Sequence, residues 1–351
     1  MILAALLLGG CATTDVQIPQ GTAALGDPAR AVPAAVETVV TTDPRVDADD
    51  PALWADPRDP SRALLFGTDK SDGLYVHGMD GRVRQFFADG PLNNVDLRPG
   101  FRVGDKEYVL VAATERKRFG IMTYLLDPGT MEVTRYGFVP TGAEFGEPYG
   151  FCMGQRDGAF YLMFNNKLGA VLQYRLTAGA DGPEAVLARS MKVGSQPEGC
   201  VADDKRGHLY VGEEDVGIWR ADLDPADPAG LEKIIAVDGV RLVADVEGLA
   251  IMSDGGTDYL IASSQGDSTF PMWRIEPGGY AYVGRFAVAG GAIDAVTETD
   301  GVSAWSGPIG PFPEGAVAMH DTDDAPHRGQ QNYKIVDWRT VRAALGLPGP
   351  G

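Results

Sequence analysis

From residue 45 onward, the chain repeats one arrangement of residues about every fifty positions. Each unit contains an apolar strand, a polar tip, a second apolar strand that ends near Tyr or Trp, and an acidic turn rich in Gly or Pro. The aromatic residues near the end of the second strand lie 45 to 54 positions apart, at Tyr75, Tyr124, Tyr174, Trp219 and Trp273. Self-similarity at such a period indicates a repeat architecture built from one supersecondary unit.

Two polar positions recur in every unit. The polar tips are Lys70, Arg116, Lys167, Glu214, Gln265 and Asp321. The short strands that precede the tips open at Asp50, Asp96, Tyr149, Glu198, Glu247 and Asp300. Six units of short strands predict an all-β, six-bladed β-propeller, because helical solenoids need amphipathic helices. The VETVV segment near residue 38 is predicted to supply the outer strand of the last blade and to close the ring.

The composition agrees with this fold and excludes some functions. The 46 Gly and 24 Pro among 351 residues favour many short strands and tight turns over long helices. With 49 acidic and 30 basic residues, the formal net charge is −19, which argues against nucleic-acid binding. The hydrophobic content of 44% is enough to fill a core.

The N-terminus has the pattern of a processing signal. The apolar run 2–8 is too short to span a bilayer and is followed by Gly9, Gly10 and Cys11, as in a bacterial lipoprotein signal. We therefore expect a signal over 1–11 that ends at a lipidated Cys11, a flexible tether over 12–35 and the propeller over 36–345. An ordinary secretory signal and a wrongly chosen start codon are the alternatives. The protein is predicted to be exported to the cell envelope, as an outer-membrane lipoprotein or otherwise as a periplasmic or secreted protein.

Three cysteines provide neither a disulfide scaffold nor a zinc-finger spacing. Apart from Cys11, the chain contains Cys152 and Cys200, which we interpret as free core thiols, with one disulfide as the alternative. No nucleophile-elbow, zinc-protease or P-loop motif occurs.

Equivalent positions of successive blades meet at one end of a propeller's central channel, so both polar series are expected at one mouth. Blades one to three contribute the basic residues Lys70, Arg116 and Lys167. The acidic residues are Asp49, Asp50, Glu198, Glu213, Glu214, Asp215, Asp245, Glu247, Asp294 and Asp300. A single acid of this kind is usually a solvated turn residue. Acids that recur at equivalent positions, without Cys or His, instead favour Ca²⁺ or Mg²⁺, and a basic half beside them favours a phosphate-bearing polyanion.

Several motifs, in order over about residues 45–340, resemble β-propeller phytases. These motifs are DADDPALW at 47–54, SDGLYVHGMDG at 71–81, NNVDLR at 93–98, YGF at 149–151, SQPEGCVADD at 195–204, LYVGEEDVGIW at 209–219, DVEGLAI at 245–251, SSQG at 263–266 and NYKIVDW at 332–338. Pro197, where the family pattern has Thr, and the lipoprotein-like start depart from that pattern.

The resemblance implies a calcium-dependent phosphatase that releases phosphate from phytate, myo-inositol hexakisphosphate, by attack of a metal-activated water. It implies substrate contacts from Lys70, Arg116, Tyr149 and Lys167, and catalytic roles for these four together with Glu198 and Glu214. The implied ligands of several calcium ions are Asp49, Asp50, Glu198, Glu214, Asp245, Glu247, Gln265, Asp294 and Asp300. Phytate or calcium-phytate is then the substrate of a monomer that touches the membrane only through its lipid anchor.

Two other functions use the same kind of surface. A calcium-dependent propeller lactonase or esterase would share the ring of carboxylates but has little use for three basic tips. A non-catalytic envelope propeller would bind a polyanion or a protein. Phosphate release from phytate, measured with and without calcium, distinguishes the three.

Overall fold

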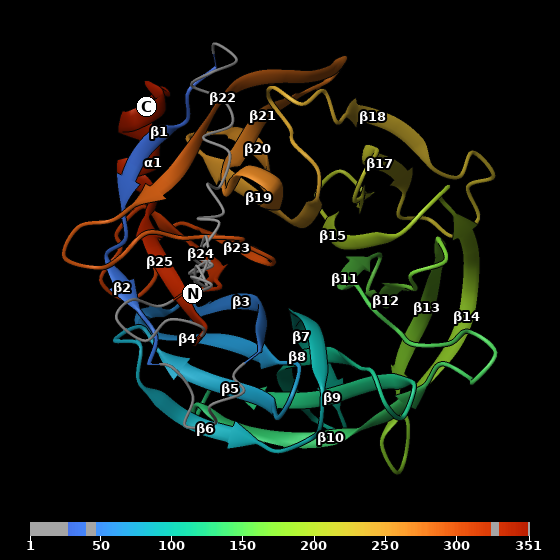
Figure 1. The fold of residues 1–351 in the computed structure, drawn as a ribbon. Helices are drawn as coiled ribbons and strands as arrows, with labels where there is room; N and C mark the ends of the chain where they lie inside the picture. Colours follow the sequence, from blue (N-terminus) through green and yellow to red (C-terminus); the bar gives the residue numbers. More distant parts are fainter. Residues whose placement is uncertain (1–26, 40–46, 324–329, 350–351) are drawn as a thin grey trace, which may run out of the picture.

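The computed structural model describes residues 27–39, 47–323 and 330–349, and shows six β-sheets arranged as blades around a central channel (Figure 1). Each blade is an antiparallel meander whose first strand is innermost. Blades one to three comprise β3 (Ala48–Asp56), β4 (Asp59–Asp69), β5 (Gly73–Gly78) and β6 (Val83–Phe87); β7 (Leu92–Val103), β8 (Lys106–Glu115), β9 (Gly120–Asp127) and β10 (Glu132–Pro140); and β11 (Phe151–Arg156), β12 (Ala159–Asn165), β13 (Ala170–Ala178) and β14 (Pro183–Lys192). The predicted six-bladed propeller is confirmed.

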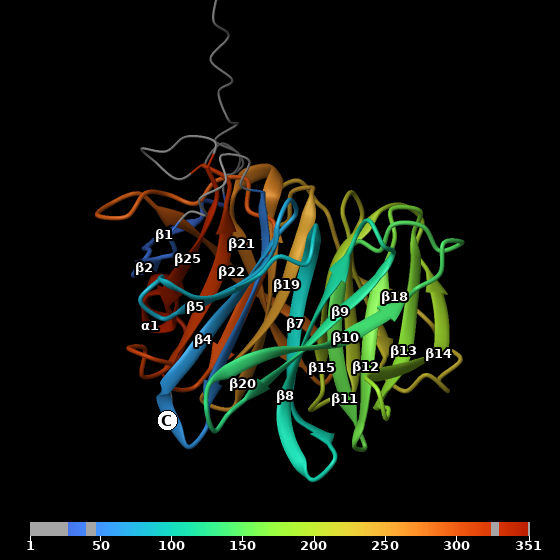
Figure 2. The same cartoon turned by 90° about the horizontal axis from the view of Figure 1, so that it is seen from below.

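The remaining three blades follow the same order. They comprise β15 (Pro197–Asp203), β16 (His208–Glu213), β17 (Gly217–Asp222) and β18 (Glu232–Ala236); β19 (Val246–Asp254), β20 (Thr257–Ser264), β21 (Phe270–Glu276) and β22 (Gly279–Ala289); and β23 (Val302–Ser306), β24 (Gly315–Asp321) and β25 (Asn332–Asp337). Five of the polar tips connect the second and third strands of their blades, and Asp321 is the last residue of the second strand of blade six, so all six lie at the same end of the channel. Figure 2 shows the blades from the side, with the strands running along the axis of the ring.

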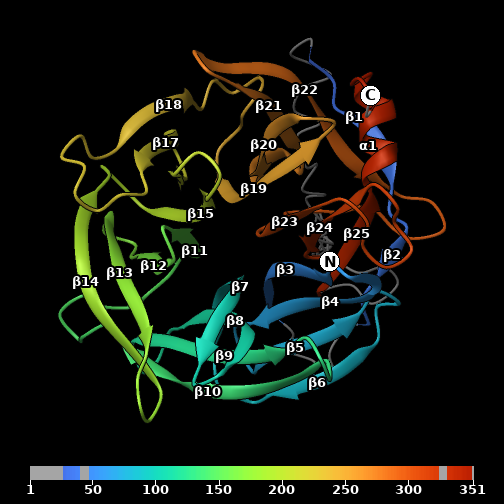
Figure 3. The same ribbon diagram turned by 180° about the vertical axis from the view of Figure 1, so that it is seen from behind.

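The N-terminal segment completes two blades. Strand β2 (Val36–Glu37) pairs antiparallel with β25, with Val36 opposite Ile335, and this confirms the predicted closure of the ring. Strand β1 (Arg30–Pro33) pairs in parallel with β22 and makes blade five a five-stranded sheet. The tether prediction is therefore wrong for residues 30–33, because they form a strand that is hydrogen-bonded to β22. Figure 3 shows β1 and β2 at the outer edges of their blades.

The hydrophobic core is divided among the interfaces between neighbouring blades. Trp54 and Phe66 of blade one, for example, share a buried cluster with Val111 and Tyr124 of blade two. Similar clusters lie between the other neighbouring blades, including between blades six and one. Because neighbouring blades pack against one another through these clusters, the sheets hold the inner strands firmly around the channel.

Helix α1 (Trp338–Leu345) ends the fold. Its N-cap is Asp337, whose side chain accepts a hydrogen bond from the backbone N–H of Arg339. Buried Trp338 and Val341 pack into the core between blades five and six. Within the described residues, no helix has the length and apolar character needed to cross a bilayer.

A disulfide joins Cys152 of β11 to Cys200 of β15, so the free-thiol interpretation is wrong and the alternative holds. The two strands are the innermost strands of consecutive blades, and the two Cα atoms lie 5.5 Å apart. The bond thus ties blade three to blade four beside the channel.

Candidate functional site

The two polar series meet in one cavity of about 230 Å³ at the tip end of the channel. Its lining residues are Asp49, Lys70, Tyr149, Gln196, Glu198, Glu214, Asp245, Glu247, Gln265 and Asp300. Three of the six predicted tips, Lys70, Glu214 and Gln265, thus converge here with four of the six predicted strand openings, Tyr149, Glu198, Glu247 and Asp300. We call this cavity the mouth.

A β-bulge aims the inner-strand residues at the mouth. The pairing of inner and second strands shifts register in four blades, at Ala48/Pro51, Leu92/Val95, Pro197/Cys200 and Val246/Leu249. A bulge adds a residue to one strand and changes the direction of its side chains. Asp49, Glu198 and Glu247 lie within these bulges, and for this reason carboxylates from three blades can point at one space.

The residue that follows Tyr149, Glu198, Glu247 or Asp300 in the chain lies against the backbone of the neighbouring inner strand. In blades three to six this residue is Gly, because neighbouring inner strands approach closely. A Cβ at Gly199 would lie 2.0 Å from the backbone oxygen of Glu247, and one at Gly248 would lie 2.4 Å from the backbone nitrogen of Val302. Blades one and two carry Asp50 and Asn94 instead.

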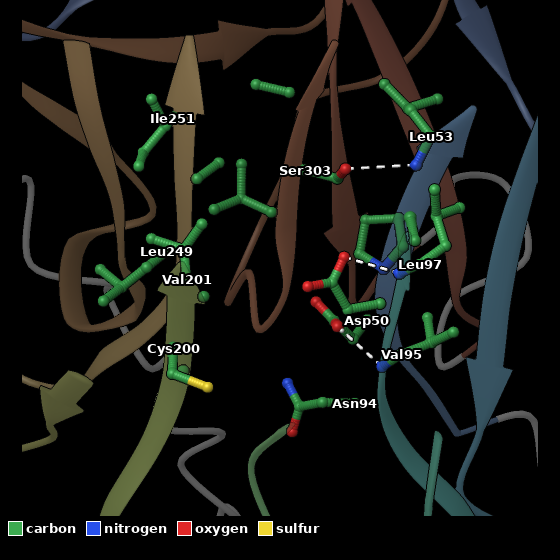
Figure 4. Close-up of a pocket in the computed structure, with 18 of the residues that line it drawn as sticks. Asp50, Leu53, Asn94, Val95, Leu97, Cys200, Val201, Leu249, Ile251 and Ser303 are labelled. Atoms are coloured by element: carbon green, nitrogen blue, oxygen red, sulfur yellow. Dashed lines mark hydrogen bonds between the residues drawn. The ribbon is translucent and has the colours of Figure 1, made fainter. Parts of the chain in front are cut away.

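Asp50 therefore lines a second cavity, deeper in the channel, and not the mouth. This channel cavity has a volume of about 280 Å³ and is lined mainly by apolar side chains such as Leu53 and Leu249 (Figure 4). The Asp50 carboxylate accepts a hydrogen bond from the backbone N–H of Val95 at 3.0 Å. Burial, followed by the charge of Asp49, raises the pKa of Asp50 well above its ordinary value.

The acids of the mouth are crowded together. Glu198, Glu214 and Glu247 each place a carboxylate oxygen within 4.8 Å of the others. Burial, followed by the Asp49 charge, raises the pKa of Glu198 to about 7. Burial also raises the pKa of Glu214 to about 7 and, with the Glu198 charge, raises that of Glu247 well above the ordinary value. Such carboxylates bind a proton or a cation more readily than an exposed carboxylate does.

Two carboxylate oxygens of the mouth have no hydrogen-bond donor. They are Oδ2 of Asp49 and Oε2 of Glu247, and both are buried. A buried anionic oxygen without a partner is costly unless a cation approaches it. Oxygen ligands in this number are the donors that Ca²⁺ prefers, so the residues present fit a calcium site.

Lys70 lies among the acids and not in a separate basic half. Its Nζ is 2.9 Å from Oδ1 of Asp49 and 3.1 Å from Oδ2 of Asp300. Burial alone would lower the pKa of Lys70, but these two carboxylates raise it. The lysine is thus a fixed positive charge that connects blades one and six.

Arg116 and Lys167 border the mouth through Tyr149. Nζ of Lys167 lies 4.2 Å from the centre of the Tyr149 ring, and Cζ of Arg116 lies 5.8 Å from it. Arg116 also contacts Glu147, with Nη2 at 2.6 Å from Oε1. Burial, followed by the charges of Glu198 and Glu247, raises the pKa of Tyr149, so its hydroxyl keeps its proton and remains a donor.

The other predicted metal ligands divide into two groups. Asp245, Gln265 and Asp300 line the mouth, and Nε2 of Gln265 donates a hydrogen bond to Oδ1 of Asp300. Asp294 lies outside that lining, and its Oδ1 is 2.6 Å from Nζ of buried Lys334. Asp294 is therefore paired with a cation of this chain, and its role as a metal ligand stays a prediction.

Glu213, the neighbour of Glu214, has a structural role. Its buried carboxylate accepts hydrogen bonds from Ser195 Oγ at 2.7 Å and from Trp219 Nε1 at 2.8 Å. It also accepts from the backbone N–H of Ser195. The neighbours Glu213 and Glu214 thus have different roles. The Glu213 carboxylate is held by hydrogen-bond donors, whereas the Glu214 carboxylate lines the mouth.

Sequence reasoning missed two polar residues that hold the mouth acids. Nε2 of Gln196 donates to Oε1 of Glu214 at 2.6 Å, and Nδ2 of Asn93 donates to Oε1 of Glu198 at 2.9 Å. Asn93 occupies the position in blade two that Asp49 occupies in blade one. Asn93 could have been recognised by aligning the units on the positions of their bulges instead of on their charged residues.

Comparison with known proteins gives one consistent result. The family model described as Phytase matches residues 1–348. A curated 3-phytase from Bacillus subtilis (strain 168) is 35% identical over 312 residues, which cover 85% of this chain and 81% of the relative. The crystal structure of a Thermus thermophilus protein that is described as an oxidoreductase (glucose dehydrogenase) by assignment matches with a TM-score of 0.53 and 13% identity, covering 88% of this chain and all of that one. At this low identity, the structural match shows likeness of fold alone.

Proposed function

This chain belongs to the phytase family and is a phytate-hydrolysing phosphatase, and we propose that its mouth works as a calcium-dependent site. The observation that supports the calcium dependence is the crowding of Glu198, Glu214 and Glu247 beside unpartnered buried oxygens of Asp49 and Glu247. Carboxylates in this arrangement repel one another unless cations lie among them.

The mouth offers oxygen ligands from several blades. The residues that would hold calcium are Asp49, Glu198, Glu214, Asp245, Glu247, Gln265 and Asp300. Bound calcium supplies positive charge to phosphate oxygens and acidifies water, which suits a mouth whose described lining contains no Ser, Cys or His. Asp50, in the channel cavity below, is a further candidate ligand.

The chain's own cations and donors hold the substrate. Lys70 lies inside the mouth, while Lys167 and Arg116 both lie against the ring of Tyr149 at its border. Phytate carries a phosphate on each ring carbon, so one phosphate can enter the mouth while Lys167 and Arg116 bind a neighbouring one. Lys70, inside the mouth, would then stabilise the charge of the transferred phosphoryl group, while Lys167 and Arg116 hold the substrate in position for in-line attack by water.

Measurement of phosphate release from phytate by the full chain tests the calcium dependence. We expect phosphate release in excess calcium. This activity should be lost after verified chelation and should recover when calcium is restored. Lys205 forms an ion pair with Asp258 away from the mouth, so Lys205→Ala is a suitable control that keeps the activity. Unchanged phosphate release in chelator, with the metal content shown to be nil, would refute the calcium requirement. Family membership favours this function over the lactonase and the non-catalytic propeller.

We also propose that the protein is exported and anchored through a lipidated Cys11, at the outer membrane if the cell has one. Residues 1–11 lie outside the described residues, and support comes from the apolar run before Cys11 and from the Cys152–Cys200 disulfide, since disulfides persist in oxidising compartments. Cys11→Ala should move the protein to the soluble fraction with its activity intact. Continued membrane fractionation of that variant would contradict the anchor.

The remaining details of substrate and assembly belong to the same proposal. We propose that phytate enters free or as its calcium complex, and that the chain acts as a monomer. Each blade interface is filled within one chain, so no partner is needed to complete the mouth. Light scattering at working concentration, with and without calcium, tests the monomer, and a dimer mass would contradict it.

A further inference from the structure

We propose that His320 and Tyr333 are positioning residues, which hold Asp300 and Asp49 in the arrangement that the mouth needs to bind calcium. The inference rests on the proposed calcium-dependent function and adds two residues that do not line the mouth. Both residues belong to the middle strands of blade six.

His320 and Tyr333 form a cross-strand pair. His320 on β24 lies directly opposite Tyr333 on β25. Their rings meet edge to face, with centres 6.3 Å apart and planes at 64°. Both side chains are buried, with 1% and 3% of their surface exposed. A buried polar pair must find hydrogen-bond partners nearby, and each of these finds a backbone amide of a mouth acid.

The imidazole of His320 supports Asp300. Its Nδ1 accepts a hydrogen bond from the backbone N–H of Asp300 at 3.1 Å. With Nδ1 accepting, the ring proton is on Nε2, which donates to Oε1 of Gln331 at 3.0 Å. The backbone N–H of His320 also donates to the carbonyl of Gly301 at 3.1 Å. Asp300 is thus held through its main chain by a residue on the next strand.

The phenol of Tyr333 supports Asp49 in the same way. Its oxygen accepts a hydrogen bond from the backbone N–H of Asp49 at 3.1 Å and donates to the carbonyl of Thr68 at 2.5 Å. The ring lies over Gly67, where a Cβ would come within 2.3 Å of Cε2 of Tyr333. Tyr333 thus reaches from blade six into the bulge of blade one.

The two supported acids act together at the mouth. The backbone N–H of Gly301 donates to the carbonyl of Asp49 at 3.0 Å, so the two segments are also bonded to each other. Their carboxylates both contact Nζ of Lys70. Loss of an acceptor on His320 or Tyr333 would leave a buried N–H unpaired beside the ligand it holds. Residues that orient ligands in this way typically change metal affinity or activity by about 10–100-fold when replaced.

The chain contains a matched control in His77. This residue is also 1% exposed and packs against the same Tyr333 ring, with centres 6.4 Å apart and planes at 65°. Its Nδ1, however, contacts the carbonyl of Gly81 at 3.2 Å and no residue of the mouth. His77→Leu therefore removes a buried imidazole from the same neighbourhood without removing support from an acid.

The experiment compares His320→Leu, His320→Asn, Tyr333→Phe and His77→Leu in the full chain. Calcium affinity of the substrate-free protein is measured by calorimetric titration, together with the thermal midpoint and with kcat and KM for phytate. We expect His320→Leu and Tyr333→Phe to weaken calcium binding by about tenfold or more and to lower kcat. Asn can place Oδ1 near the position of Nδ1, so His320→Asn should restore most of the affinity. His77→Leu should lower the thermal midpoint alone.

Tyr333→Phe removes a single oxygen and His320→Asn keeps a polar group, so folded protein remains for the test if His320→Leu does not fold. Calcium affinities and kcat values in these variants equal to those of His77→Leu would overturn the positioning role and reduce both residues to core packing. Wild-type protein that binds no calcium would overturn the proposed calcium-dependent function as well. The two failures are therefore distinguishable.

Discussion

Replacement of Glu198 by Gln should stabilise the metal-free protein at neutral and alkaline pH. The side chain is 4% exposed, and its pKa is about 7 in the folded protein against an ordinary value of 4.5. Below pH 4.5 the carboxyl is protonated in the folded and unfolded states alike. Between pH 4.5 and 7 the unfolded chain releases this proton and the folded protein keeps it, so unfolding becomes more favourable as the pH rises.

The size of this effect follows from the shift in pKa. One pKa unit corresponds to about 1.4 kcal/mol, so the carboxylate destabilises the metal-free fold by about 3 kcal/mol above pH 7. Gln has no such cost, and its Oε1 can still accept the hydrogen bond that Nδ2 of Asn93 donates. The free energy of unfolding of Glu198→Gln should therefore exceed that of the wild type by almost nothing near pH 4.5 and by about 3 kcal/mol at pH 8.

Urea unfolding in chelator at several pH values measures this difference. With excess calcium the order should reverse, because the variant has lost a ligand and gains less from binding. Glu213→Gln is the matched control, since its equally buried carboxylate is satisfied by Ser195 and Trp219, and it should destabilise the protein with or without calcium. A Glu198→Gln protein that is less stable than the wild type in chelator at pH 8 would refute the reasoning. A difference that does not change with pH would do the same.

Other changes test other parts of the site. Glu214→Gln should lower kcat by about 10² or more at saturating calcium, as expected when a key electrostatic group is lost, and wild-type turnover would contradict its role. Lys167→Ala should lower kcat/KM for phytate and weaken inhibition by inorganic phosphate while calcium still raises the thermal midpoint; unchanged phosphate inhibition would remove it from the substrate site. Calcium-dependent activity should fall as the pH drops below 7, where Glu198 and Glu214 take up protons, and more calcium should move the profile to lower pH. An equal profile at all calcium concentrations would count against metal–proton competition. Replacing Cys152 and Cys200 by Ser should cost about 2–4 kcal/mol in urea unfolding, because the bond joins residues 48 positions apart, and no loss would mean the bond is absent in solution.

The number of blades and the end of the channel that bears the site could be predicted because both are properties of the repeat. A strand alternates its side chains locally, and a spacing of about fifty residues places the equivalent position of each blade at the same end of the channel. The tips from Lys70 to Gln265 and the inner-strand acids from Asp49 to Asp300 could be recognised for this reason. The closing strand at Val36–Glu37 was predictable because blade six lacked a fourth strand within its own unit.

The chemistry at each of these positions was decided by the tertiary structure. Lys70 was predicted in a basic half, yet it pairs with Asp300, 230 residues away, and Asp294 is paired with Lys334. Asp50 follows Asp49 in the chain but lies in the channel below, because a bulge turns the two side chains to different levels. The Cys152–Cys200 bond depends likewise on the approach of two inner strands.

The sequence alone thus determined the six blades, the mouth and the residue types gathered there, because these follow from a local pattern repeated about every fifty residues. Only the tertiary structure decided which carboxylate is satisfied, which is left without a partner and which cation lies among them. Charge and burial depend on atoms from other blades, as when Tyr333 supports Asp49 across 284 residues. The repeat specifies that these polar side chains meet at one end of the channel. Which of them form hydrogen bonds or ion pairs with one another is set by the packing of all six blades.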